Sequence, residues 1–257
     1  MKKKLLPLII AAIAAAPMSF ATETIRIGVE AGYAPFEIKK PDGSLVGFDI
    51  DLGNEICERM KAKCVWVETE FDGLIPALKA KKIDAILSAL SITPARLKEI
   101  AFTQKLYATG ARLVTPKNVE VDNTATALVG KRIGVLQGST SDTYAQSQWA
   151  TKGVQIVTYQ NQDLVYADLV NGRLDAAFQD TVAADSGFLK QPIGSRFHFS
   201  GDEISDEAYF GIGTGIGLRK EDTELKTNMD KAFSSMLADG TYSTISSNYF
   251  DFNIYGK

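Results

Sequence analysis

Residues 26–32 read RIGVEAG, and residues 132–138 read RIGVLQG. A second match follows in the same order, because LKAKKIDAILS (78–88) aligns with LVNGRLDAAFQ (169–179). Each copy gives a short apolar strand, a glycine-marked turn, a helix, a basic turn and a second strand that begins with Asp-Ala. Strands that alternate with helices are typical of parallel α/β sheets. The repeated pattern therefore predicts two similar α/β lobes.

The segments around these repeats predict how the lobes are completed and joined. The first copy is longer because it contains FEIKKPDGSLVGFD (36–49), whose Pro-Asp-Gly turn between strand-like arms predicts a hairpin. Two extended runs, 101–118 and 209–220, suit passages of the chain between lobes. Residues 222–250 have apolar residues at helical spacing and a glycine stop, so they predict a C-terminal helix. The glycines of GIGTGIG do not open an apolar helix after a strand, which disfavours a dinucleotide-binding loop.

Residues 1–21, MKKKLLPLIIAAIAAAPMSFA, have the features of a secretory signal peptide. Three lysines precede an apolar run, and Ser19 and Ala21 are small residues at the cleavage positions, so we expect cleavage after Ala21. The run is shorter than the ~20 apolar residues that a membrane span needs. Removal of this segment takes three of the 28 basic residues and changes the formal net charge from −3 to −6. An acidic chain disfavours nucleic acid as a partner.

The two cysteines, Cys57 and Cys64, lie in NEICERMKAKCVWV. In an exported chain this spacing predicts a disulfide between a helix end and the next strand. A zinc site would need more ligands, and the one histidine of the chain is His198. We therefore expect neither a metal site nor a cofactor.

The strand ends indicate where a ligand would bind. In open α/β sheets, ligands bind at the carboxyl ends of the strands, near helix N-termini. This rule selects 30–36 and 88–96 in the first predicted lobe, and 136–141 and 179–180 in the second. If the lobes face each other, the four segments meet across one cleft.

Two of these segments are suited to an anion. Thr93 and Pro94 predict a helix start, and Arg96 then lies in the first turn, where a cation opposes the helix dipole. Arginine binds carboxylates through two parallel hydrogen bonds, although a solvated surface arginine is the alternative. Residues 138–141, Gly-Ser-Thr-Ser, precede a second predicted helix with free backbone N–H groups. Simple N-capping would explain this second pattern equally well.

Two acidic residues are suited to cations. Glu30 and Asp180 end buried strands, where an unpaired carboxylate is costly, so each suits one positive charge. Tyr33 and Phe71 could form flat walls against an aliphatic chain or a guanidinium, although aromatic residues are more often part of a core. The residues that we expect to serve structure instead are Asp84, Asp175, Trp66 and Trp149.

The chain lacks the common enzyme motifs. It contains no G-x-S-x-G, H-E-x-x-H or P-loop pattern, and His198 lies far from any nucleophile motif. Two anion-binding groups and two carboxylates without an activated nucleophile fit a zwitterion that carries one further positive charge. The residues therefore predict a binding protein for a basic L-amino acid.

Five segments also carry a family resemblance. These segments are GYAPFE (32–37), VGFDIDLGNEIC (46–57), FDGLIPALKAKKIDAILSALSIT (71–93), GVLQGST (134–140) and YFDFNIYGK (249–257). Beyond the signal segment, the chain resembles along its whole length the periplasmic solute-binding proteins of polar amino-acid ABC transporters, in the lysine/arginine/ornithine- and histidine-binding branch. The resemblance implies a hinged two-lobe Venus-flytrap fold of type II with two crossovers. Its limits would be 22–109 plus 211–257 for lobe 1 and 110–210 for lobe 2.

The resemblance implies a monomer without enzymatic activity, with a disulfide between Cys57 and Cys64, that delivers its ligand to an inner-membrane ABC permease. The implied contacts of the ligand α-carboxylate are Arg96 and the backbone N–H groups of Ser91 and Ser139 or Thr140. Those of the α-ammonium are Asp180, Ser91 and the region of Ser88. The side-chain slot would be formed by Tyr33, Phe71 and Leu136, with Glu30 at its distal end.

Three positions depart from what we expect in this branch. Glu30 stands in place of aspartate, Ala89 in place of serine and Ser141 in place of glutamine. All three belong to the implied slot or its rim. A longer acid and the smaller Ser141 suit a guanidinium, so arginine is favoured over lysine, ornithine and histidine.

Two other functions are compatible with the same fold. A periplasmic cyclohexadienyl dehydratase, acting on prephenate or arogenate, would need an acid in the cleft, for which Glu30 is the obvious candidate. A sensory domain of a receptor would need a transmembrane or kinase segment, and the sequence beyond residue 21 has neither.

Overall fold

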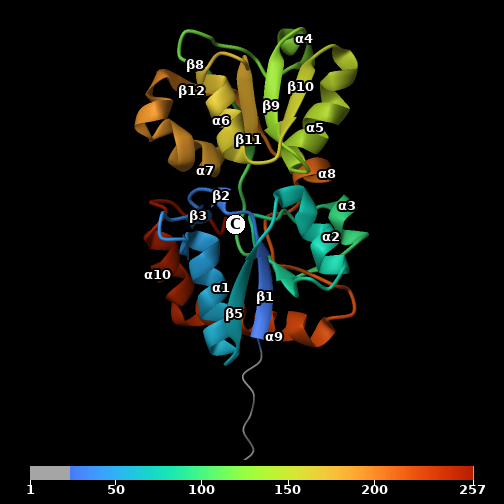
Figure 1. Cartoon of the computed structure of the whole chain (residues 1–257), viewed down its shortest axis with the longest axis vertical. Helices are drawn as coiled ribbons and strands as arrows, with labels where there is room; N and C mark the ends of the chain where they lie inside the picture. The colour runs from blue at the N-terminus through green and yellow to red at the C-terminus, as the bar shows by residue number, and fades with distance from the viewer. Residues whose placement is uncertain (1–23, 257) are drawn as a thin grey trace, which may run out of the picture.

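A computed structural model describes residues 24–256 as two lobes, each built around a five-stranded sheet (Figure 1). The strand order is β5-β1-β6-β13-β7 in the first lobe and β10-β9-β11-β8-β12 in the second. In both sheets the first three strands are parallel, and the fourth is antiparallel to both of its neighbours. The two lobes share one topology, and the prediction of mixed, mostly parallel α/β sheets is confirmed.

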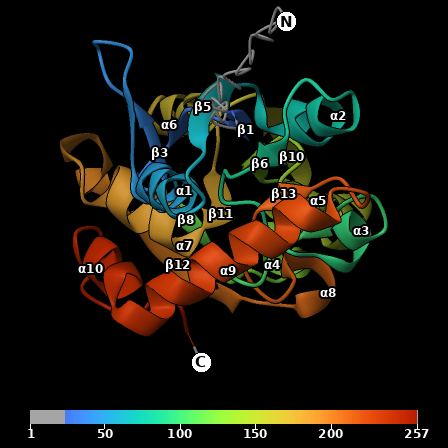
Figure 2. The ribbon, with the colours of Figure 1, turned by 90° about the horizontal axis from the view of Figure 1, so that it is seen from below.

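The first lobe is assembled from both ends of the chain. Its main strands are β1 (Thr24–Val29), β5 (Lys63–Glu68), β6 (Ala85–Ile86), β7 (Ala101–Phe102) and β13 (Gly217–Leu218). A small sheet contains β2 (Gly32–Tyr33), β3 (Glu37–Lys39) and β4 (Leu45–Val46), which confirms the predicted hairpin. The helices are α1 (Phe48–Arg59), α2 (Leu74–Lys79), α3 (Pro94–Leu97), α9 (Thr223–Asp239) and α10 (Thr241–Ser247). The long helix α9 ends at Gly240, as predicted, and crosses the end of this lobe that lies away from the second lobe (Figures 1 and 2).

The second lobe is formed by one continuous segment. Its strands are β8 (Ala111–Pro116), β9 (Arg132–Leu136), β10 (Gln155–Tyr159), β11 (Ala176–Asp180) and β12 (Phe197–Ile204). Its helices are α4 (Ala125–Leu128), α5 (Thr140–Gln148), α6 (Gln162–Val170), α7 (Thr181–Ala184) and α8 (Glu207–Phe210). Trp149 is buried in its core, as predicted. No helix within residues 24–256 has the length and apolar character that crossing a membrane requires. The predicted signal peptide lies outside the described residues.

The chain passes between the lobes twice, and the two passages pair with each other. Leu106 N–H donates to the Thr214 carbonyl, and Thr214 N–H donates to the Tyr107 carbonyl, both at 2.8 Å. The antiparallel fourth strand of each sheet, β8 or β13, is the strand that enters from one of these passages. The two paired crossovers form a narrow connection between the lobes (Figure 1).

The sequence repeat that predicted two lobes has a structural cause in each sheet. Arg26, on β1, donates to Asp84 through its backbone N–H and its guanidinium (2.7–3.1 Å). Arg132 makes the same backbone and side-chain hydrogen bonds to Asp175 in the second lobe. Each pair ties the start of one strand to the start of its neighbour. Asp84 and Asp175 therefore serve structure, as predicted.

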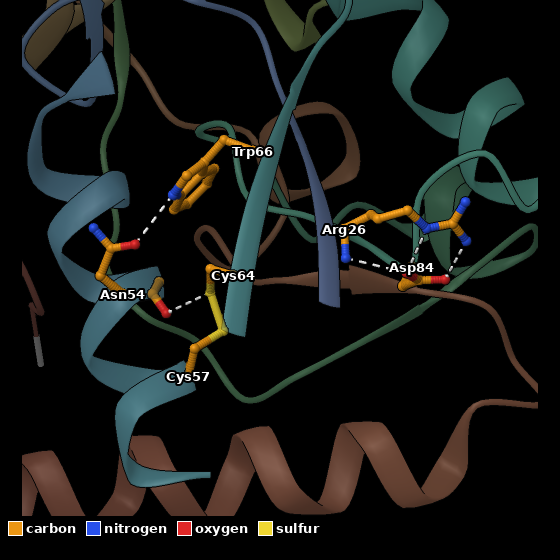
Figure 3. Close-up of a disulfide and its surroundings, with 7 residues drawn as sticks. Arg26, Asn54, Cys57, Cys64, Trp66 and Asp84 are labelled. Carbon is orange, nitrogen blue, oxygen red and sulfur yellow. Dashed lines mark hydrogen bonds and ion pairs between the residues drawn. A yellow bond between two sulfur atoms is a disulfide. The ribbon is translucent and has the colours of Figure 1, made fainter. Parts of the chain in front are cut away.

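The disulfide between Cys57 and Cys64 joins the end of α1 to the start of β5, with 6.0 Å between the Cα atoms (Figure 3). This confirms the predicted pairing. On the same strand, the Trp66 indole N–H donates to Asn54 Oδ1 on α1 at 3.1 Å, so β5 and α1 are joined twice. The disulfide lies at the amino end of β5, away from the carboxyl ends of the strands.

We predict that replacing both cysteines by serine lowers the free energy of unfolding by about 2.5 kcal/mol, because the seven-residue separation closes a short loop in the unfolded chain. Urea denaturation measures this change. Ligand affinity measured by calorimetry stays within twofold of wild type, since the bridge is remote from the cleft. A large loss of affinity would show that the disulfide supports the binding site.

Candidate ligand-binding site

A pocket lies where the two lobes meet, and residues of both lobes line it. Ten of the twelve residues predicted to contact a ligand line it. These are Tyr33, Phe71, Ala89, Ser91, Arg96, Leu136, Ser139, Thr140, Ser141 and Asp180. The first five belong to the first lobe and the last five to the second. The structure therefore brings residues from both lobes to one pocket.

Arg96 provides the positive charge at one end of the pocket. Its side chain donates to the Ser91 carbonyl at 3.0 Å and, across the cleft, to the Gly138 carbonyl at 3.1 Å. It also lies over the Phe71 ring, 5.5 Å from the centroid. Burial lowers the pKa of this guanidinium to about 10, and it makes no ion pair with a carboxylate within residues 24–256. A partly buried cation without a counterion favours binding of an anion.

The local backbone explains this position of Arg96. Thr93 caps α3, accepting from the Arg96 N–H at 3.2 Å, and Pro94 is the first helical residue, as predicted. The helix is a single turn. The guanidinium is therefore placed by the cap and by the two carbonyls rather than by a long helix.

Backbone N–H groups converge on the same end of the pocket. Those of Ser91, Thr140 and Ser141 have no acceptor in the part of the chain that the structure describes. Thr140 and Ser141 are the first two residues of α5, where N–H groups have no partner within the helix. By contrast, Ser139 N–H donates to the Leu136 carbonyl at 3.2 Å, and the Ser139 hydroxyl caps α5. Of the two predicted alternatives, Thr140 rather than Ser139 has a free N–H group.

Asp180 provides a negative charge in the pocket. It ends β11 and caps α7, where its Oδ1 accepts from the Ala183 N–H at 2.8 Å. Burial raises its pKa to about 6, against hydrogen bonds from Thr109 and from backbone N–H groups that lower it. Asp180 makes no ion pair with a basic side chain within residues 24–256. Neutralisation by a cation from outside the chain would offset the cost of this burial.

The walls of the pocket are apolar and aromatic. Tyr33 stacks on Phe36 with 6.1 Å between ring centroids, and Phe71 lies below the Arg96 guanidinium. Leu136 is buried at the end of β9 on the opposite lobe. The side chains of Tyr33, Phe71 and Leu136 all line the pocket.

Glu30 lies beside the pocket rather than in its lining. It is only 5 % exposed and, with Gly32, Glu70 and Asp163, lines a second, more open cavity between the lobes. Its Oε2 atom is buried and has no hydrogen-bond partner in residues 24–256. Burial, followed by the charges of Glu70 and Asp163, raises the pKa of Glu30 to about 7. A cation at this place would relieve both effects.

Comparison with known proteins places this geometry in a family. Residues 25–252 match the model of the bacterial extracellular solute-binding proteins, family 3. The chain belongs to this family. It is 55 % identical, over all of both chains, to the histidine-binding periplasmic protein and to the lysine/arginine/ornithine-binding periplasmic protein of Escherichia coli (strain K12). A solved periplasmic binding protein from Salmonella typhimurium, described as having high arginine specificity, has a TM-score of 0.82 and 32 % identity, and the match covers 89 % of this chain and 100 % of that one.

The solute-binding protein is not an enzyme, because these relatives are binding proteins. This removes the support for the dehydratase alternative, which depended on Glu30 as a general acid. In the structure, Glu30 faces acidic neighbours and the cavity between the lobes.

Ser88 is the other predicted residue that does not line the pocket of this solute-binding protein. It is 1 % exposed, and its hydroxyl accepts from the Glu30 N–H at 3.0 Å and donates to Glu37 Oε1 at 2.8 Å. Its side chain therefore links the backbone of Glu30 to Glu37 and is not free to contact a ligand. The neighbouring Ala89 lines the pocket with a φ of 45°, and its N–H donates to the buried Asp49 at 2.7 Å.

Four pocket residues were not predicted from the sequence. They are Thr109, Gly110, Ala111 and Phe210. All lie in or beside the two runs, 101–118 and 209–220, that the sequence marked as passages between lobes. A hinge lies at the back of the cleft between two lobes. The two predicted passages were therefore the sequence feature from which these four pocket residues could have been predicted.

Proposed function

We propose that this protein binds a basic L-amino acid in the periplasm, with arginine favoured over lysine, ornithine and histidine, and delivers it as a monomer to an inner-membrane ABC permease. The observation that carries this proposal is the distribution of unpaired charge. Arg96 lacks a carboxylate partner, while Asp180 and Glu30 lack basic partners within residues 24–256. An α-carboxylate, an α-ammonium and a distal cation would complement the three groups.

The ligand α-carboxylate would accept hydrogen bonds from the Arg96 guanidinium and from the N–H groups of Ser91 and Thr140. The α-ammonium would donate to Asp180 and to the region of Ser91. The aliphatic chain would lie between Tyr33 and Phe71, and the distal cation would approach Glu30. The names of the relatives, which include lysine, arginine, ornithine and histidine among their ligands, support the class of ligand.

Binding would stabilise the closed arrangement of the two lobes. We propose residues 22–109 plus 211–257 as lobe 1 and residues 110–210 as lobe 2. The lobes already touch beside the pocket: Arg96 donates to the Gly138 carbonyl, and Gln137 donates to Asp72 at 2.7 Å. A ligand that contacts both Arg96 and Asp180 adds contacts that exist only when the lobes are closed. A ligand shifts this equilibrium only through its higher affinity for the closed form.

Titration calorimetry with the twenty common L-amino acids, ornithine and citrulline tests the proposal. We expect saturable heat with basic amino acids and the tightest binding with arginine. Absence of heat with arginine, lysine, ornithine and histidine would overturn the proposal.

Export is tested separately by N-terminal sequencing of the periplasmic form, where we expect a chain that starts at Thr22.

We predict that Glu30→Gln weakens arginine binding at least about 30-fold, because it removes the buried carboxylate that would pair with the distal cation. Glutamine, which lacks that cation, loses much less affinity. The change also alters the pH profile. A guanidinium favours ionised Glu30, so wild-type affinity for arginine falls as the pH drops through about 7, and the variant lacks this part of the profile.

Calorimetry at pH 5.5 to 8.5 measures both effects. The exposed Glu99→Gln, which removes a surface pair with Lys79 in the same lobe, is the matched control. An arginine-to-glutamine preference that is equal in Glu30→Gln and Glu99→Gln would show that Glu30 does not contact the ligand side chain.

A further inference from the structure

The cavity beside Glu30 contains a second acidic residue from the opposite lobe. Asp163 lies in the first turn of α6, in the second lobe, whereas Glu30 and Glu70 belong to the first. All three line the same cavity between the lobes. The one basic residue that lines this cavity, Lys39, is paired with Glu68 at 2.9 Å.

The distance between the two carboxylates can be bounded. A Cβ atom built on Gly32 would lie 3.1 Å from Glu30 Oε1 and 3.9 Å from Asp163 Oδ2, so these two oxygens are at most about 7.0 Å apart. Glu30 is 95 % buried and its other oxygen has no partner in residues 24–256, whereas Asp163 is exposed at the rim. No set of three or more acidic, histidine or cysteine residues in the described part of the chain has the arrangement of a metal site.

We infer that Asp163 is a residue of the second lobe that selects for a positive charge at the distal end of the ligand. This inference rests on the proposed function. Closing the lobes brings Asp163 toward Glu30 and Glu70, and the three acids then line one cavity. A distal guanidinium or ammonium between them turns this repulsion into attraction. A neutral ligand of the same shape leaves the repulsion in place, so the closed form discriminates against it.

Glu30 alone does not link the charge of the ligand to closure of the lobes. Its carboxylate belongs to the first lobe, so its distance to a ligand held in that lobe does not depend on closure. Asp163 reaches the site only in the closed form and therefore links the charge of the ligand to the open–closed equilibrium. Specificity then includes a repulsive element directed against neutral ligands.

The size of the effect follows from Coulomb's law. Two unit charges about 7 Å apart, the upper bound for the Glu30 and Asp163 oxygens, change an equilibrium constant roughly threefold at the dielectric constant of water and roughly 50-fold at an effective value of 20. Because Asp163 is exposed, we expect a value toward the lower end, about fivefold.

The test compares L-arginine with L-citrulline, which has nearly the same shape but no distal charge. We expect Asp163→Asn to lower the ratio of arginine to citrulline affinity about fivefold, and Asp163→Lys to lower it more than tenfold. Asp122→Asn is the control, since it removes an exposed aspartate in the loop before α4, at the far end of the same lobe (Figure 1). It should leave the ratio unchanged.

Thermal unfolding separates this role from a purely structural one. An acid in the first turn of a helix also stabilises that helix, and loss of that effect lowers the melting temperature without altering the affinity ratio. Unchanged ratios in both Asp163 variants, with wild type still preferring arginine, would overturn this inference alone. Failure of the wild-type protein to bind arginine would instead overturn the proposed function.

Discussion

Arg96→Met is expected to weaken binding of every amino acid by about 10²–10⁴-fold. The variant removes the guanidinium that would pair with the α-carboxylate, and this carboxylate would then be desolvated beside N–H groups alone. Breaking a buried ion pair from one side costs about 3–5 kcal/mol, which corresponds to roughly 10²–10⁴ in affinity. Methionine keeps the length of the chain and the packing on Phe71.

Two further measurements make this prediction specific. The unliganded variant should be at least as stable as wild type, because the partly buried Arg96 is paired only with two backbone carbonyls. Arg173→Met is the control, since Arg173 is a surface residue whose side chain is 69 % exposed and pairs with Asp168. Binding of arginine by Arg96→Met within tenfold of wild type would show that the carboxylate lies elsewhere.

The fold was predictable because its two halves repeat the same local chemistry. The Arg-Ile-Gly-Val and Asp-Ala motifs recur because an arginine–aspartate pair joins two neighbouring strands in each sheet. The pairs are Arg26 with Asp84 and Arg132 with Asp175. Pairing residues that lie 58 and 43 positions apart leaves a readable signal, since both partners occupy strand starts. The disulfide was predictable for a different reason: two cysteines in a chain that we expect to be exported leave one pairing.

The site was predictable in the segments where strands end but not in the hinge. Thr109 and Phe210 occupy no motif, and they reach the pocket only because the two crossovers pair at Leu106, Tyr107 and Thr214. That pairing joins residues more than 100 positions apart and has no counterpart in local sequence pattern. Ser88 shows the converse limit. It has the expected position at a strand end, yet its hydroxyl donates a hydrogen bond to a buried acid, Glu37, instead of facing the pocket.

Asp163 shows why selectivity is harder to predict than the main site. Its position in the first turn of α6 has a sufficient local explanation in the helix dipole, so the sequence gives no reason to look further. The role that we propose depends on Glu30 of the other lobe, which lines the same cavity. The role of a residue that depends on how two lobes face each other can be inferred from the structure but not from a local sequence pattern.

Asp180→Asn is the second large effect, and we expect it to weaken every amino acid about 10²–10⁴-fold, since it removes the carboxylate that would accept the α-ammonium. Asparagine retains an oxygen for the Ala183 N–H, so the cap of α7 is preserved. Calorimetry with arginine, lysine and glutamine measures the loss. Equal weakening of charged and neutral ligands distinguishes this role from that of Glu30, whose loss acts mainly on cationic ligands.

The pH dependence gives an independent check on the same group. Its pKa of about 6 without ligand is raised by burial, and an ammonium partner favours the ionised form. A proton and the ligand therefore compete for Asp180, so wild-type affinity has a step in which it falls as the pH drops through about 6, below the step due to Glu30. Asp180→Asn lacks the step at about 6. Asp175→Asn, at the opposite end of β11, is the matched control: it disturbs the pair with Arg132 and should lower stability slightly while leaving affinity intact. Equal affinities of the Asp180 and Asp175 variants for arginine would place the α-ammonium away from this strand.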